Sequence, residues 1–190
     1  SLLDVIKLNT SVDVVVGGRD QGADRYHRQR LISWWDQSRV AEARVLVVGA
    51  GALGPEICKL LALTGIGRVL VFDPDHIEAS NLARTVLFRG DDAGRAKASV
   101  AAERMIALNP DVRVLGRSEN VIASCGLGAF RWADVVIAGV DNREARVFVN
   151  SACARVGRAW VGGAIEGLQG VDRVFDPAHT ACYVCTMNGT

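Results

Sequence analysis

The chain has 190 residues, of which 49% are hydrophobic and 23% are charged, so it is long enough for one hydrophobic core of ordinary size. Its formal net charge of +1 leaves no basic footprint for nucleic acid or an anionic membrane surface. No apolar run reaches the length of a membrane span, and the N-terminal SLLDVIKLNT lacks the features of a secretory signal. We therefore expect a cytoplasmic protein without nucleic-acid or membrane partners.

The first 43 residues are expected to form an N-terminal extension. SVDVVVGG, at residues 11–18, is typical of a short strand that ends at glycines. GADRYHRQRLISWW, at residues 22–35, predicts a helix for which Asp24 is a suitable cap.

A buried strand and a long helix follow. RVLVVG, at residues 44–49, is a continuous apolar run that stops at a glycine, as a strand buried on both faces does. The helix expected within residues 50–67 has Pro55 in its first turn and Gly65 as its C-terminal stop. Residues 68–72, RVLVF, predict the second strand.

The alternation of strands and helices continues along the chain. Helices are expected at residues 93–110 and 143–157, and strands at residues 112–116, 133–141 and 159–165. This order predicts βαβ units, and hence an α/β, Rossmann-like domain over residues 44–190. Its sheet should be mostly parallel, with helices on both faces.

A glycine-rich turn follows the first predicted strand. Gly49, Gly51 and Gly54 form a GxGxxG, which allows backbone N–H groups to approach a phosphate at the start of a helix. Asp73, at the end of the second strand, has the spacing of an acid that accepts hydrogen bonds from ribose hydroxyls. Alone, this pattern points first to NAD. The structural alternative is a glycine turn that merely allows close helix packing.

Further polar residues favour a different nucleotide. Asn81 and Arg84 are three residues apart, so one helical turn would place them on the same face, and Lys97 follows within the same βα unit. Asp141 ends the fourth predicted strand. An amide and two cations suit a triphosphate, and an aspartate at a strand end suits Mg²⁺. The set favours adenylyl transfer from ATP over hydride transfer, although each residue alone could be an ordinary surface or turn residue.

Six motifs of the chain occur in a characteristic order, namely RYHRQ, GAGALG, VFDPDHIEASNLART, DAGRAKA, GVDNREAR and CYVC. In this order they resemble the ubiquitin-activating-enzyme superfamily. That superfamily includes the adenylyltransferases that activate sulfur-carrier proteins for thiamin and molybdopterin synthesis. The resemblance covers roughly residues 24–188.

The resemblance implies an ATP site in this chain. The residues that match it are Gly49, Gly51, Gly54, Asp73, Asn81, Arg84, Lys97, Asp141 and Asn142. Asp73 matches the ribose-binding acid, and Asp141, beside Asn142, matches the residue associated with Mg²⁺ and the reaction centre. Arg28 matches an arginine that in related dimers reaches into the partner subunit's ATP site.

The resemblance also implies an activity. It is the ATP-dependent adenylation of the C-terminal carboxylate of a ubiquitin-like or sulfur-carrier protein that ends in glycine, with release of pyrophosphate. The enzyme is expected to be a homodimer, or a heterodimer with a related fold. The alternatives are a non-catalytic structural half of an activating enzyme, a NAD-dependent oxidoreductase, and adenylation of a tRNA base, which the near-neutral charge does not support. Ala83, Thr85 and Arg95 depart from residues common in the family but remove no charged group.

The cysteines predict a metal site only near the end of the chain. Cys182 and Cys185 form a CxxC, and a structural zinc ion often takes two such pairs. Family members commonly carry the second pair much further on, so we expect half of a zinc site, in a chain truncated before that pair and before any thioester cysteine. A redox CxxC is the alternative, but no thioredoxin-like pattern surrounds it. Cys58, Cys125 and Cys153 lack the context of a nucleophile.

Overall fold

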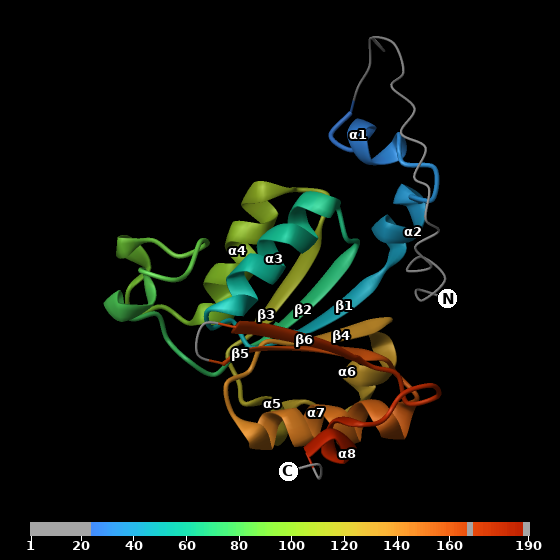
Figure 1. The fold of residues 1–190 in the computed structure, drawn as a ribbon. Coiled ribbons are helices and arrows are strands. Elements are labelled where there is room, and N and C mark those ends of the chain that lie inside the picture. Colours follow the sequence, from blue (N-terminus) through green and yellow to red (C-terminus); the bar gives the residue numbers. More distant parts are fainter. Residues whose placement is uncertain (1–23, 167–168, 188–190) are drawn as a thin grey trace.

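The structure is a computed structural model that describes residues 24–166 and 169–187 (Figure 1). The described residues contain a six-stranded sheet in the order β3-β2-β1-β4-β5-β6. The strands are β1 (Arg44–Val48), β2 (Arg68–Phe72), β3 (Arg113–Arg117), β4 (Val135–Ala138), β5 (Trp160–Glu166) and β6 (Gln169–Phe175). The predicted α/β, Rossmann-like class with a mostly parallel sheet is confirmed.

Helices cover both faces of this sheet (Figure 1). α3 (Leu53–Thr64) and α4 (Lys97–Leu108) pack on one face, and the other face carries α5 (Val121–Ser124), α6 (Leu127–Trp132), α7 (Arg143–Val156) and α8 (Tyr183–Met187). Each face has its own cluster of buried apolar side chains, so the central strands are buried on both sides. Among the described residues, no helix has both the length and the apolar character needed to cross a membrane.

The order of the strands places a switch point between β1 and β4. The chain moves outward from β1 through β2 to β3, and then returns to the other side of β1 with β4 and β5. The carboxyl ends of β1 and β4 therefore lie side by side while the chain leaves them toward opposite faces. Ligands of such sheets bind beyond this edge.

The edge strand β6 was not predicted from the sequence. It pairs antiparallel with β5 along seven residue pairs, from Trp160 opposite Phe175 to Glu166 opposite Gln169. Only Phe175 of β6 is buried, where its ring stacks on Trp160 with centroids 4.4 Å apart. A strand that is exposed on both faces carries no alternating apolar pattern, which explains why the sequence did not reveal it.

The helix expected over residues 22–35 is wrong for the described part of that range. Only α1 (His27–Arg30) is helical there, and a separate helix, α2 (Gln37–Glu42), follows. The side chain of Asp36 accepts hydrogen bonds from the backbone N–H groups of Ser38 and Arg39, so it starts a new helix instead of allowing the first to continue. The strand expected at residues 11–18 lies outside the described residues.

The helix expected over residues 93–110 begins late, at Lys97. Gly94 has φ +81°, and its N–H donates to Ile77, whose own N–H donates to Arg95. Residues before Lys97 are therefore paired with the strand-exit segment near Ile77 instead of forming a helical turn. This pairing brings the start of α4 close to the carboxyl end of β2.

The segment before β1 is attached at the amino ends of the strands. The Asn109 side chain donates to the Tyr26 hydroxyl (2.6 Å) and to the carbonyl of Ala62 (2.7 Å). Gly65, in the left-handed conformation that ends α3, has no room for a Cβ because the Tyr26 ring would lie 2.5 Å from it. α1 therefore lies at the end of α3 that is remote from the glycine-rich turn (Figure 1).

Candidate nucleotide site

A cavity of about 800 Å³ lies at the carboxyl ends of β1, β2 and β4, at the switch point of the sheet. Seven of the residues predicted from the sequence line it: Gly49, Gly51, Asp73, Arg84, Lys97, Asp141 and Asn142. They come from three different connections, those after β1, β2 and β4, so the fold brings together residues that are up to about ninety positions apart in the chain. Gly54, Asn81 and Arg28 are not part of the lining.

The glycine-rich turn is shaped by close backbone approach. Gly49 has φ +94°, and a Cβ there would lie 2.7 Å from the carbonyl oxygen of Gly139, at the exit of β4. A Cβ at Gly54 would lie 2.2 Å from the carbonyl oxygen of Gly49. The absence of a side chain at Gly54 therefore allows the start of α3 to pack closely against the turn. Gly51 lines the cavity itself. The N–H groups of the first turn of α3 have no intrahelical acceptor, and an anion in the cavity would suit them.

Asp73 joins the end of β2 to the glycine-rich turn. Its carboxyl group is buried, with Oδ2 accepting from the Ala50 N–H at 2.6 Å and Oδ1 accepting from the Asp75 N–H at 2.8 Å. Burial raises the pKa of this carboxyl above its usual value, against these two hydrogen bonds and the charge of Lys97, which lower it. Each oxygen keeps further acceptor capacity. The side chain can therefore hold the turn and still accept from ribose hydroxyls.

Lys97 is the first residue of α4 and points toward the end of β2. Its Nζ lies 2.8 Å from Oδ2 of Asp75, and its backbone N–H donates to the Asp75 carbonyl at 2.9 Å. The lysine is nearly buried, whereas the Asp75 side chain is 64% exposed. Asp75 also lines the cavity. A phosphate in the cavity would compete with this carboxylate for the ammonium group.

Of Asn81 and Arg84, only Arg84 lines the cavity. Asn81 is buried, and its Oδ1 accepts from the Glu78 N–H at 3.1 Å, which closes the short helical turn η2 (Ala79–Asn81). Arg84 is exposed, lines the cavity and donates from Nη1 to the Ser80 carbonyl at 2.8 Å. Asn81 therefore shapes the turn from which Arg84 projects.

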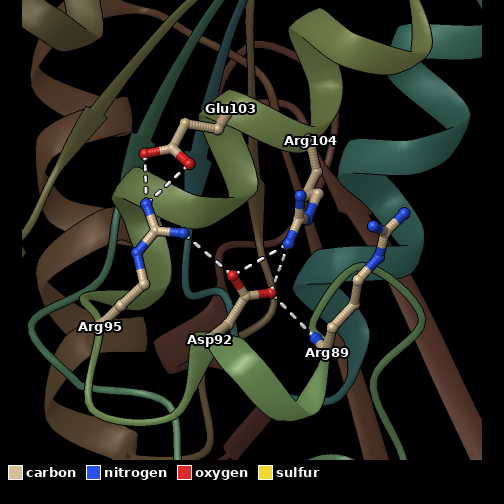
Figure 2. Close-up of polar contacts among 5 residues, drawn as sticks. All are labelled: Arg89, Asp92, Arg95, Glu103 and Arg104. Carbon is tan, nitrogen blue, oxygen red and sulfur yellow. Dashed lines mark hydrogen bonds and ion pairs between the residues drawn. The ribbon is translucent and has the colours of Figure 1, made fainter.

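A buried ion-pair network holds the connection between Arg84 and Lys97 against α4 (Figure 2). Asp92, which is 1% exposed, accepts from Nη2 of Arg104 at 2.8 Å, from Nη1 of Arg95 at 3.0 Å and from the Arg89 N–H at 2.9 Å. Arg95 also contacts both carboxylate oxygens of Glu103, at 2.6 and 2.7 Å. Arg95, expected only as a departure from the family pattern, is thus a structural member of this network.

The connection after β4 presents Asp141 to the cavity. The next residue, Asn142, is the N-cap of α7, with Oδ1 accepting from the Ala145 N–H at 2.8 Å. Asn142 therefore has a structural role in addition to lining the cavity. The carboxylate of Asp141 is exposed and has no hydrogen-bond partner among the described residues.

Several lining residues were not found from the sequence. Asp75 lies two residues after the predicted ribose acid, on the same connection. Arg146 lies one helical turn after the Asn142 cap, a spacing that returns a side chain to the helix start. Asn120 and Ile122 line the cavity from the connection after β3, in which no site residue was predicted from the sequence. They could have been predicted only from their positions, because each lies shortly after the end of a predicted strand or near the start of the helix that follows.

Arg28 lies far from the cavity of its own chain. α1 is held beside Gly65, at the C-terminal end of α3, whereas the cavity lies at the N-terminal end of that helix. α3 has 12 residues, so its two ends are roughly 18 Å apart at 1.5 Å per residue. The structure of this single chain therefore offers Arg28 no contact with its own nucleotide site.

Burial of Cys58, Cys125 and Cys153 disfavours the thiolate form that a nucleophile needs. Burial raises the pKa of the Cys58 and Cys153 thiols to about 12 and that of Cys125 to about 11, so all three are neutral at physiological pH. No thiol of these three lines the cavity.

The thiols of Cys182 and Cys185 lie at the start of α8, with their Sγ atoms 3.2 Å apart. The Cys185 N–H donates to Sγ of Cys182, which lowers the pKa of the Cys182 thiol, and the Cys185 thiol in turn has a raised pKa. Two thiolates supply half of a tetrahedral zinc site. Within the described part of the chain, no group of three or more potential metal ligands is present.

Comparison with known proteins identifies the family. The model of the ThiF family matches residues 23–190. The chain belongs to the ThiF family. This confirms the resemblance that the six motifs indicated.

Named relatives of this ThiF-family chain are adenylyltransferases and a ubiquitin-like modifier-activating enzyme. It is 41% identical to the sulfur carrier protein adenylyltransferase of Thermus thermophilus, over 80% of this chain and 57% of the relative. It is 35% identical to the sulfur carrier protein ThiS adenylyltransferase of Bacillus subtilis (86% and 50%) and 31% identical to ubiquitin-like modifier-activating enzyme 5 of rice (77% and 38%). The chain thus spans about half the length of the curated relatives it matches, or less.

A solved structure shares the fold. The crystal structure of Escherichia coli MccB with MccA-N7isoASN superimposes with a TM-score of 0.76 at 27% identity, and the match covers 86% of this chain and 51% of MccB.

Proposed function

We propose that this chain binds ATP in the cavity and transfers the adenylyl group to the C-terminal carboxylate of a ubiquitin-like or sulfur-carrier protein. The observation that carries the proposal is the convergence of Asp73, Arg84, Lys97 and Asp141 on one cavity beside a glycine-rich turn. A buried acid, two cations and an exposed carboxylate match a ribose, a triphosphate and a metal ion. The names of the relatives support the same class of reaction.

In the proposed step, a carboxylate oxygen of the carrier tail attacks the α-phosphorus of ATP. A bond forms between that oxygen and the phosphorus, and the bond from the phosphorus to the oxygen that bridges the β-phosphate breaks. The electron pair of the broken bond leaves with pyrophosphate, and the carrier becomes an acyl adenylate. Arg84 and Lys97 would stabilise the negative charge that grows on the phosphates, as fixed donors aimed at developing charge do.

The residues of the cavity fit a magnesium ion. Asp141 and Asp75 present exposed carboxylates to it, and Mg²⁺ prefers oxygen ligands of this kind. Bound there with ATP, the ion would neutralise part of the phosphate charge. For zinc, the described residues Cys182 and Cys185 supply two of the four ligands that a structural site takes.

The proposed partner is a carrier protein whose tail ends in glycine. The terminal glycine is what the family resemblance implies, and the names of two relatives contain a sulfur carrier protein, which supports a carrier as the partner. We further propose a dimer, either with a second copy or with a related fold, because Arg28 lies at the opposite end of α3 from its own cavity. In a dimer it can serve the partner's site.

ATP–pyrophosphate exchange tests the proposal. The protein is incubated with ATP, Mg²⁺ and labelled pyrophosphate, together with one candidate carrier at a time, and carriers that lack the terminal glycine serve as controls. We expect carrier-dependent label in ATP. Calorimetry with NAD provides the second arm, since tighter binding of NAD than of ATP would overturn adenylation in favour of an oxidoreductase.

A further inference from the structure

Arg146 connects three elements around the cavity. It lies in the second turn of α7, and its guanidinium points back toward the start of the helix. Its Nη2 donates to the carbonyl of Gly163 in β5 at 2.7 Å and to the carbonyl of Val140, in the connection that follows β4. One nitrogen thus joins the exit of β4 and the middle of the neighbouring strand β5 to the helix that connects them.

The backbone on both sides of Asp141 is anchored. On its N-terminal side, the Val140 carbonyl is held by Arg146, and on its C-terminal side, Asn142 caps α7 through the Ala145 N–H. The Asp141 carboxylate itself has no hydrogen-bond partner among the described residues. The place of Asp141 at the cavity is therefore set by the backbone that carries it, and hence by the two anchors.

The two glycines of β5 lie close to their neighbours. A Cβ at Gly162 would lie 2.8 Å from the Trp160 ring but only in ordinary contact, 3.6 Å, with Nη1 of Arg146, and a Cβ at Gly163 would lie 3.1 Å from the side chain of Leu53 in α3. The β5 backbone is therefore packed closely at this point, and the Gly163 carbonyl accepts from Arg146 there.

We propose that Arg146 is a positioning residue, which holds the Val140–Asn142 connection so that Asp141 faces the cavity. The predicted effect of Arg146 on catalysis rests on the proposed adenylation activity. Its predicted effect on the structure of the Val140–Asn142 connection does not. The guanidinium acts through the backbone and need not touch the nucleotide. Arg146 should consequently influence turnover more than nucleotide affinity.

The test compares three variants of the full chain. Arg146→Met removes the charge and all donors, and Arg146→Lys keeps the charge and a donor that reaches one carbonyl. Arg155→Met makes the same change in the last turn of α7, far from the cavity, and serves as the matched control. Hydrogen–deuterium exchange of the peptide that spans residues 139–146 reports on the connection, and thermal unfolding reports on the fold.

We expect faster amide exchange at residues 139–146 in Arg146→Met, and wild-type exchange there in Arg155→Met. In pyrophosphate exchange, Arg146→Met should lower kcat by about tenfold to a hundredfold, as small misplacements of catalytic groups do. The KM for ATP should stay within about twofold, and Arg146→Lys should recover part of kcat. In an Asp141→Asn background, Arg146→Met should cause no further loss, because its effect passes through Asp141.

Unchanged amide exchange in Arg146→Met would overturn the proposal, whatever the protein catalyses. So would an equal loss of kcat in both Asp141 backgrounds, since Arg146 would then act independently of Asp141. Faster amide exchange in a wild-type fold that adenylates no carrier would instead refute the proposed function and support the positioning role.

Discussion

Lys97 and Asp75 form an ion pair of 2.8 Å at the wall of the cavity, and the lysine is nearly buried while the aspartate is exposed. The backbone N–H of Lys97 also donates to the Asp75 carbonyl. The ammonium group that the proposed reaction needs at a phosphate is thus already held in place, by a carboxylate that repels phosphate.

Asp75→Asn should therefore strengthen the binding of metal-free ATP. The change removes one negative charge near the phosphates and frees Lys97, which should tighten the dissociation constant by about fivefold for a largely solvated interaction. Calorimetry in the presence of a chelator measures it. Asp91→Asn, an exposed carboxylate on the same connection outside the cavity lining, is the matched control. Weaker binding in Asp75→Asn would show that the carboxylate supports the nucleotide instead of competing with it.

Arg84→Ala and Lys97→Ala should each lower the rate of pyrophosphate exchange by about 10²–10³-fold, the usual cost of removing one fixed donor from a developing charge. Arg84 is exposed, so its loss should leave the unfolding midpoint unchanged. Arg89→Ala is a suitable control, because only its backbone N–H takes part in the Asp92 network. Exchange at the wild-type rate in both site variants would refute their role at the phosphates.

Asp92→Asn should destabilise the fold by about 1–3 kcal/mol, because Arg104 and Arg95 lose a buried acceptor but remain partly open to water. Urea unfolding at pH 7 measures the difference. The matched control is Asp91→Asn, next to it in the chain but exposed. A difference below the error of the measurement would show that water replaces the carboxylate without cost.

The same pair of proteins should show a defined pH dependence. Burial acts to raise the pKa of Asp92, but hydrogen bonds from Arg104 and the Arg89 N–H, together with the arginine charges, outweigh it and leave the pKa below its usual value. A lowered pKa in the folded chain adds stability that is complete above the unfolded pKa, about 3.9, and is lost as the pH falls below it. The wild type and Asp92→Asn should therefore differ equally at pH 7 and pH 5 and converge below about pH 4.

Mixing Arg28→Ala with Asp141→Ala chains should restore activity if Arg28 serves a second subunit. A mixed dimer then holds one intact site, and random exchange of subunits would give about a quarter of the wild-type activity. Native mass spectrometry with one labelled chain verifies subunit exchange. No recovery among proven mixed dimers would place Arg28 outside catalysis, since its own cavity lies at the far end of α3.

The main strands and long helices of the fold were predictable because the sequence patterns that indicate them are local. Buried parallel strands such as Arg44–Val48 read as continuous apolar runs, and Gly65 marks a helix end by its left-handed conformation. α5 and α6, of four and six residues, are too short for a helical period to emerge. The single helix predicted over residues 22–35 was wrong because Asp36 caps a separate helix, α2. The spacing of apolar residues does not reveal such side-chain hydrogen bonds to the backbone.

The location of the cavity was also predictable, because strand ends meet at one edge of a parallel sheet. The directions of individual side chains were not. Asn81 has the spacing of a ligand residue, yet its amide oxygen accepts from the Glu78 N–H and closes a turn. The role of Arg146 was not predicted because its hydrogen-bond partners are two backbone carbonyl groups, and the sequence does not indicate which carbonyl groups a side chain will reach.

The switch point has a consequence for how the protein is made. The glycine-rich turn, Asp73 and Lys97 belong to the part of the chain that leaves the ribosome first, and Asp141 follows only with β4. The part of the chain made before β4 contains Asp73 and Lys97 but not Asp141. If adenylation needs Asp141 as proposed, the chain gains this activity only after β4 has been translated, because the residues that complete the cavity come late in the sequence.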